Sequence, residues 1–194
     1  MTDTKTSRKE HILEAAAKLF SEQGYASVGM RDLAQAVGIE SSSLYSHFGK
    51  KEDILWDIAL HCAQDFNDTV SPIAHSDLHT KRKLQEMIIA HVDVTLRNRL
   101  AAPIFTTEWR ILSEPRRSQY ANLRDEYEKM FRNVIAKGVE ENLFRPIDEK
   151  FSALTILSAL NWTYLWYKPE GELTPNQIGE TLAQMLTDGL VRTF

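Results

Sequence analysis

The sequence predicts an all-α protein, in which a three-helix unit with a helix-turn-helix precedes a larger helical domain. Apolar residues recur at helical spacing along nearly the whole chain, no segment alternates apolar and polar residues as a strand would, and prolines stand in loops or at helix starts. We expect about nine helices, at residues 8–23, 30–37, 41–48, 51–70, 81–99, 103–112, 115–142, 149–167 and 174–190. A domain boundary is expected near residue 51, between residues 1–51 and 52–194.

The composition is that of an ordinary globular protein. The chain has 194 residues, of which 43% are hydrophobic and 26% are charged. No run approaches the roughly 18 consecutive apolar residues of a membrane span, and the polar residues 1–10 lack the apolar core of a signal peptide. We therefore expect a cytoplasmic protein without membrane contact. The single cysteine, Cys62, excludes an intramolecular disulfide.

The formal net charge is −4, but the charges are distributed unevenly. Residues 1–51 carry seven Lys and Arg against six Asp and Glu, whereas residues 52–194 carry sixteen against twenty-one. The small basic excess is therefore N-terminal, with Lys5 among the cations that precede the first helix. Because a few well-placed cations are enough to neutralise phosphates, the acidic total does not exclude DNA as a partner.

Residues that favour helix caps stand at four of the expected boundaries: Gly24, Gly38, Asp148 and Thr174. Thr174 is followed three residues later by Gln177, which is the pattern of a capping box. Pro72 is expected to end the fourth helix, because proline lacks the backbone N–H that a helix interior needs.

Residues 30–37, the glycine turn at Gly38 and residues 41–48 have the outline of a helix-turn-helix. The second helix of such a pair enters the major groove of DNA. Six apolar residues can pack the three short helices into one small core: Leu33, Ala34, Val37, Ile39, Leu44 and Phe48.

Five short motifs follow one another at fixed spacing: Gly24-Tyr25, Met30–Ala34, Val37–Ile39, Leu44–Phe48 and Lys51–Ile54. Over about 45 residues this arrangement resembles the N-terminal signature of TetR-family regulators. The resemblance implies a bacterial, dimeric, one-component transcription repressor. Residues 1–51 would then be its DNA-binding domain, and residues 52–194 its ligand-binding and dimerisation domain.

Seven residues are the expected DNA contacts: Arg31, Ser41, Ser42, Ser43, Tyr45, His47 and Lys51. The serines lie at the end of the helix that faces base edges, where hydroxyls give modest specificity. Tyr45 and His47 can reach phosphates, and Lys51 resembles the phosphate-binding lysine of the family. For Tyr45 the alternative is a packing role.

The sequence departs from the family pattern at both short helices. Val28 and Gly29 stand where hydroxyl residues are common, and Glu40 stands where serine usually caps the recognition helix. These residues put a hydroxyl–phosphate contact at the first of the two helices in doubt. An acidic side chain at position 40 would also repel nearby phosphates.

The helix expected at residues 149–167 is apolar on nearly all sides, so it must be covered on all sides. In a chain of this length, that pattern indicates a partner subunit. By resemblance, the last two long helices form a four-helix bundle across a two-fold axis. We therefore expect a homodimer through residues 149–192 that binds a palindromic operator.

The segment from Leu160 to Gly171 resembles the matching stretch of TetR-type regulators of fatty-acid and steroid catabolism. That resemblance implies an acyl-CoA thioester as the effector that releases DNA. The expected effector residues are Phe105, Trp109, Arg110, Arg124, Tyr127, Trp162 and Trp166. Arg116 and Arg117 are further candidate cations for the CoA phosphates.

Other interpretations of the larger domain remain open. An aromatic pocket for lipophilic cations is the alternative effector site, and Glu108 is the acidic residue closest to the central aromatics. His91 lies on an apolar helix face, where a hydrogen-bonded core histidine competes with a pocket contact. Catalytic motifs such as a Gly-rich phosphate loop, HExxH or CxxC are absent from the sequence, so we expect neither an enzyme nor a cofactor or metal. A helical interaction module without DNA binding is the remaining rival.

Overall fold

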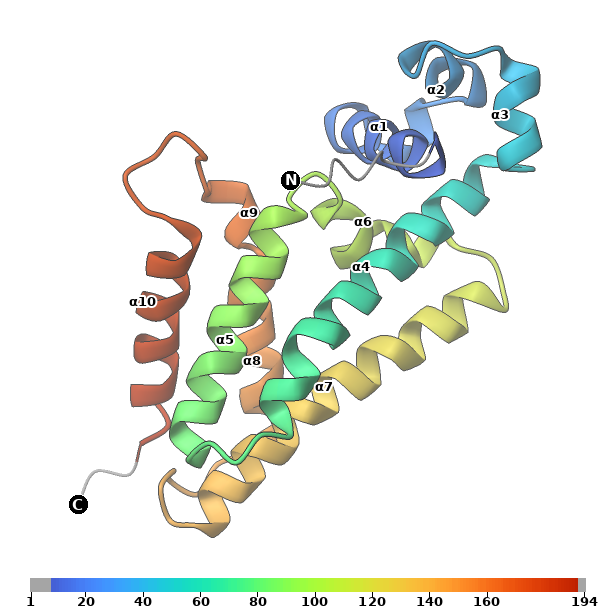
Figure 1. Ribbon diagram of the computed structural model, residues 1–194. Helices are drawn as coiled ribbons and strands as arrows, with labels where there is room; N and C mark the ends of the chain where they lie inside the picture. The colour runs from blue at the N-terminus through green and yellow to red at the C-terminus, as the bar shows by residue number, and fades with distance from the viewer. Residues whose placement is uncertain (1–7, 192–194) are drawn as a thin grey trace. The chain divides into compact units, whose positions relative to one another are not determined.

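The structure is a computed structural model that describes residues 8–191, and its regular elements are almost all helices (Figure 1). The α-helices are α1 (Arg8–Gln23), α2 (Met30–Ala36), α3 (Ser41–His47), α4 (Lys51–Ala74), α5 (Thr80–Arg97), α6 (Ala102–Thr106), α7 (Arg116–Glu140), α8 (Glu149–Asn161), α9 (Thr163–Trp166) and α10 (Pro175–Asp188). Two 3₁₀ turns, η1 (Tyr25–Ser27) and η2 (Glu108–Ile111), and one isolated bridge between Phe144 and Val191 complete the fold. The all-α prediction is confirmed, and each of the nine expected segments contains helix. Lys5 and residue 192 lie outside the described residues.

Two compact units divide the chain, and each is described by itself. One contains the described residues up to Cys62 together with Leu100–Tyr120, and the other contains Ala63–Arg99 together with the described residues from Ala121. The helices α4 and α7 run from one unit into the other. Within the described residues, no helix is both long and apolar enough to cross a membrane.

The first unit contains the three-helix head, which is α1, α2 and α3. Its core is built from apolar residues that are at most 3% exposed: Ile12, Ala16, Phe20, Leu33, Ala34, Leu44 and Phe48. Gly38 has a φ of 66°, and it ends α2 in a Schellman motif in which Ile39 donates its backbone N–H to the Ala34 carbonyl. Gly24 ends α1 with a φ of 80°. The sequence predicted Gly24 as a C-terminal cap and Gly38 as the glycine that ends the next helix, and the positive φ angles fit both predictions.

In the second unit α5 packs against α8 and, most extensively, against α10 (Figure 1). The closest approach is at Gly179 of α10, where a Cβ would lie 3.1 Å from the Cα of Ile89. The predicted caps of α8 and α10 are confirmed: the Asp148 carboxylate accepts the Phe151 N–H at 2.6 Å, and Thr174 and Gln177 form a capping box.

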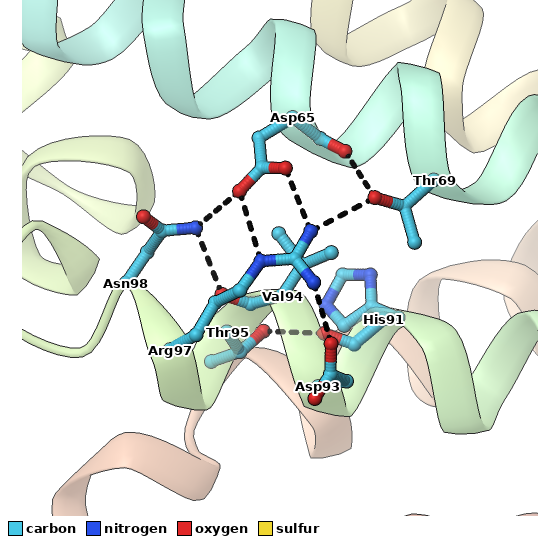
Figure 2. Close-up of polar contacts among 8 residues, drawn as sticks. All are labelled: Asp65, Thr69, His91, Asp93, Val94, Thr95, Arg97 and Asn98. Atoms are coloured by element: carbon cyan, nitrogen blue, oxygen red, sulfur yellow. Dashed lines mark hydrogen bonds and ion pairs between the residues drawn. The ribbon is translucent and has the colours of Figure 1, made fainter. Parts of the chain in front are cut away.

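A polar network joins α5 to the second half of α4 (Figure 2). The Arg97 guanidinium donates to both carboxylate oxygens of Asp65, at 2.6 and 3.2 Å, and to the hydroxyl of Thr69 at 2.9 Å. The Asn98 amide also donates to Asp65, at 2.6 Å. Because Arg97 is further paired with Asp93, one planar cation fixes groups on both helices.

Two predicted helix ends are wrong. Helix α4 continues through Pro72 to Ala74. The helix tolerates Pro72 because the missing N–H would have bonded the carbonyl of Asp68, which is exposed and can be hydrated. The helix expected at residues 149–167 is interrupted at Trp162, where the Thr163 hydroxyl donates to the Leu160 carbonyl at 2.7 Å. Side-chain bonding of this kind competes with the helical ladder.

Substitution of Gly138 tests the packing of α7. An added Cβ would overlap the ring of Phe144, which is 1% exposed and cannot move aside. We expect Gly138→Ala to lower the free energy of unfolding by about 2 kcal/mol, because overpacking outweighs the gain in helix propensity. The matched control is Gly189→Ala, where the nearest atom is 3.6 Å from the added carbon. Urea unfolding measures both, and equal stability of the two variants would contradict the packing described here.

Candidate functional site

The helix-turn-helix is formed by α2 and α3, and one side of α3 is fixed by the core. Leu44 is 0% exposed and Phe48, its C-cap, is 3% exposed. The opposite side of α3 faces outward, with Ser42, Ser46 and His47 exposed and Tyr45 52% exposed. The predicted packing alternative for Tyr45 is therefore poorly supported, because a core tyrosine would be covered.

The other predicted DNA contacts lie around the same helix. Ser41 and Ser43 are half-buried in the first turn of α3, and Arg31 is exposed on α2. At the start of α2 the Asp32 carboxylate accepts the Gly29 N–H at 2.7 Å, which is the half of a capping box that does not need an N-cap hydroxyl. Within the described chain Glu40 makes no capping hydrogen bond through its side chain. Five of the seven predicted residues thus lie on α3 and one on the neighbouring α2, at least partly accessible, while their contact with DNA stays a prediction.

Lys51, the seventh residue, is engaged inside the protein. Its Nζ donates to the carbonyls of Tyr25 and Val28 at 2.6 and 2.7 Å, and it lies 4.1 Å from the centre of the Tyr25 ring. Burial lowers the pKa of Lys51, and the negative charge of Glu108 partly opposes that shift. Two of its three N–H donors are used in this way. Lys51 therefore joins α4 to the head, whatever it contributes to phosphate binding.

The next two residues of α4 join it to the segment before α7. One oxygen of Glu52 accepts from the Ser113 N–H and hydroxyl, at 2.9 and 2.6 Å, and Asp53 accepts from Arg116 at 2.7 Å. Hydrogen bonds from Lys50 and then from Ser113 lower the pKa of Glu52 to about 2. The hydrogen bond between Glu52 and Ser113 could not be predicted from the sequence, because 61 residues separate the two partners.

The first unit holds three of the predicted effector residues. Phe105 is 2% exposed in α6, and Trp109 packs on Tyr120 with ring centroids 5.4 Å apart. Arg110 is exposed and lies 4.9 Å from the Trp109 ring. The further candidate Arg116 is occupied by Asp53, and Arg117 by Glu114 at 2.8 Å. These ion pairs make both arginines poorer candidates for CoA phosphates.

The second unit holds the other predicted effector residues, and Tyr127 belongs to a buried polar cluster. The Tyr127 hydroxyl lies 2.9 Å from Nδ1 of His91, and Oδ1 of Asn161 lies 3.2 Å from Nε2 of the same histidine. This pattern fits a neutral imidazole that accepts from Tyr127 and donates to Asn161. Burial lowers the pKa of His91 to about 3, and burial also raises the pKa of Tyr127. The sequence singled out His91 but gave no signal for Asn161.

The two tryptophans of this group are largely exposed rather than enclosed. Trp162, at the break between α8 and α9, is 47% exposed, and Trp166 is 52% exposed. Trp162 stacks on Tyr164 with centroids 6.2 Å apart. Arg124 is half-buried on α7. Because of the break at Trp162, the two tryptophans do not share the continuous helix that the sequence predicted.

Two family models match most of the chain. Residues 12–58 match the family described as bacterial regulatory proteins, tetR family, and residues 77–190 match the family described as tetracyclin repressor-like, C-terminal domain. The second match alone covers more than half of the 194 residues, so the chain belongs to the TetR family of DNA-binding transcription regulators. It is accordingly a regulator and not an enzyme.

Individual relatives are similar over nearly their whole length. The HTH-type transcriptional repressor KstR2 of Mycobacterium tuberculosis (strain H37Rv) is 28% identical over 188 residues, which cover 96% of this chain and 94% of the relative. The structure of this ketosteroid transcriptional regulator superposes with a TM-score of 0.90 and covers 100% of this chain and 98% of that chain. The TetR-family regulator PfmR of Thermus thermophilus is 32% identical, with a TM-score of 0.85 and coverage of 93% and 99%.

A further solved structure is AibR in complex with isovaleryl coenzyme A and operator DNA. It has a TM-score of 0.83, covering 97% of this chain and 100% of that chain. At 24% identity, this likeness shows the shared fold alone.

The buried state of His91 predicts how stability depends on pH. Between about pH 6.5 and 3 the unfolded chain binds a proton at His91 that the folded chain does not bind. The contribution of neutral His91 to the free energy of unfolding should therefore be complete above pH 6.5. Below that pH the free energy of unfolding should fall by up to about 1.4 kcal/mol per pH unit. Urea unfolding at pH 7.0, 6.0 and 5.0 should give a smaller slope for His91→Gln than for the wild type. The exposed His75 supplies the control, His75→Gln, and a slope that is the same in all three proteins would refute the assignment.

Proposed function

We propose that this protein is a dimeric repressor, which binds a palindromic operator through α3 and leaves it when an acyl-CoA thioester binds the helical domain. The observation that carries the DNA-binding part is the exposed face of α3. This face carries Tyr45, which is half-exposed, together with the exposed side chains of Ser42 and His47. Hydroxyl and imidazole groups of this kind can form hydrogen bonds with phosphates and base edges. Leu44 and Phe48 hold the opposite face, so the surface is presented on a fixed helix.

Dimerisation is supported by an exposed apolar surface on the last three helices and the loop before α10. Seven large apolar side chains of this region are between 44% and 72% exposed: Phe151, Leu154, Trp162, Leu165, Trp166, Leu173 and Met185. Monomeric proteins rarely expose so many neighbouring apolar groups, and such surfaces mark interfaces. A second copy of the chain is the partner that a palindromic operator requires, since a two-fold axis repeats the reading helix.

The acyl-CoA proposal rests on two supports. The segment from Leu160 to Gly171 resembles acyl-CoA-responsive regulators, and relatives of this fold include a ketosteroid regulator and a protein that binds isovaleryl coenzyme A. The proposed effector contacts are Phe105 and Trp109 in the first unit, and Tyr127, Trp162 and Trp166 in the second, each group proposed by itself. Arg110, which is exposed, and Arg124 are the proposed cations for the CoA phosphates.

The ties made by the first turn of α4 suggest how the effector acts. Lys51 bonds the head, while Glu52 and Asp53 bond the segment that leads into α7. A thioester that favours one placement of this turn would change the affinity for DNA, since coupling requires only a difference in binding between two states.

One observation supports a second candidate, an effector that is a lipophilic cation. Within the described residues, one carboxylate oxygen of Glu108 is buried without a hydrogen-bond partner. Its charge acts on Lys51 and Tyr25. A cationic aromatic ligand would supply the partner that this oxygen lacks.

Substitution of Tyr45 tests the proposed interface. We expect Tyr45→Ala to weaken operator binding by roughly ten-fold or more, which is about the energy of one or two lost hydrogen bonds and contacts. The melting temperature should change little, because the side chain is half-exposed. Fluorescence anisotropy with a labelled palindrome from upstream of the gene measures affinity, with Lys18→Ala on α1 as the control. A half-site duplex should bind much more weakly. Wild-type affinity in Tyr45→Ala would exclude the proposed docking face, and equal binding of half-site and palindrome would exclude the dimer.

Titration of the operator complex tests the effector. We expect CoA thioesters of some acyl groups to release the DNA, while the matching free acids and CoA alone do not, because both halves of the ligand are needed. Cationic aromatic compounds form the second arm of the experiment. Release by those compounds alone would replace the thioester proposal with the cation proposal. A protein that binds the duplex tightly and responds to no thioester would contradict the acyl-CoA proposal but not the repressor.

A further inference from the structure

A cavity in the second unit is lined by two lysines and by no acidic side chain. It has a volume of about 270 Å³ and lies between the end of α4, the start of α5 and the second half of α7. Its polar lining consists of His75, Thr80, Lys83, Asn133 and Lys137, and its apolar lining of Ala74, Met130 and Val134. None of these residues belongs to the proposed effector site.

Lys83 is the residue of this cavity that lacks a counterion within the described chain. The side chain lies on α5 and the residue is only 8% exposed. Among residues 8–191 it has no ion pair or side-chain hydrogen bond, whereas its neighbours Lys81 and Arg82 are paired with Asp188 and Glu86. The side chain is largely covered and lines the cavity, so an anion that enters could form a charge-assisted hydrogen bond with an ammonium that has no counterion among the described residues.

The carboxylate of Glu141 contacts two lining residues of the cavity and is already engaged. One oxygen of Glu141 accepts the Thr80 hydroxyl at 2.5 Å, and the other lies 3.7 Å from Lys137. These contacts hold Glu141 toward Thr80 and Lys137. Lys83 is left as the cation that an entering ligand would meet.

The position of Lys83 in its helix points to the same ligand. The first turn of α5 contains Lys81, Arg82 and Lys83 and no acidic residue. The N-terminus of a helix carries partial positive charge and favours anions, so three cations there are unfavourable without one. His79, the N-cap, makes no capping hydrogen bond through its side chain within the part of the chain that the structure describes.

We infer that this cavity binds a phosphate group, either inorganic phosphate or the phosphate of a small metabolite. Lys83 supplies a charge without a counterion among the described residues, Lys137 a second charge, and the Asn133 amide a neutral donor. The volume exceeds that of a bare phosphate, and Met130 and Val134 give an apolar wall for the group that carries it. The site would make the larger domain sensitive to a second small molecule, and it does not depend on the identity of the effector.

Calorimetric titration of the DNA-free protein with inorganic phosphate, at constant ionic strength in chloride, tests the site. We expect saturable binding to the wild type that weakens by roughly ten-fold or more in Lys83→Gln, because hydrogen bonds to a charged group are lost. Lys83→Arg keeps the charge and should retain binding. Lys81→Gln removes a neighbouring charge on the same helix, outside the cavity, and should bind as the wild type does.

Coenzyme A in a parallel titration separates the two sources of phosphate. Binding of CoA that depends on Lys83, with little binding of inorganic phosphate, would assign the site to a phosphorylated metabolite. Circular dichroism of each variant verifies the fold. The inference is overturned if neither ligand binds to the wild type, or if Lys83→Gln binds both as tightly as the wild type. The operator is absent from these titrations, so their failure would leave the proposed repressor function intact.

Discussion

One ammonium group joins the DNA-reading head to the rest of its unit. The helices α2 and α3 have seven residues each, and isolated helices of that length are unstable in water. Packing on α1 stabilises them, and Lys51 adds a polar tie to the connection between α1 and α2. Tyr25 and Val28, whose carbonyls Lys51 binds, are 9% and 1% exposed, so without the lysine these acceptors would have few other partners.

The first turn of α4 is a junction because three successive side chains point in three directions. Successive residues of a helix are about 100° apart, so Lys51, Glu52 and Asp53 cannot serve one neighbour. Lys51 binds the head, Glu52 binds Ser113, and Asp53 binds Arg116 at the first residue of α7. In the second half of the same helix, Asp65 is held by Arg97 (Figure 2). In this protein, charged groups therefore add to packing in fixing both halves of α4.

Local features of this fold could be predicted from the sequence, and long-range ones could not. Gly38, Asp148 and Thr174 were predicted as caps because a cap depends on a few neighbouring residues. The continuation of α4 through Pro72 could not be predicted, because it depends on whether water can reach the carbonyl left without a partner. The break at Trp162 could not be predicted either, because it depends on a hydrogen bond from the Thr163 hydroxyl to the backbone. The exposed face of α3 follows from its short pattern. The intramolecular role of Lys51 does not, because its partners lie 23 and 26 residues away.

The exposure of Trp162 and Trp166 gives the chain optical reporters on the surface that we assign to the partner subunit. Trp56 and Trp109 are half-buried, whereas these two indoles are about half in contact with water. Indole emission moves to shorter wavelength when water is removed from around the ring. Any molecule that covers α9 would therefore shift the intrinsic tryptophan emission of the protein to shorter wavelength, and no attached dye would be needed to detect it.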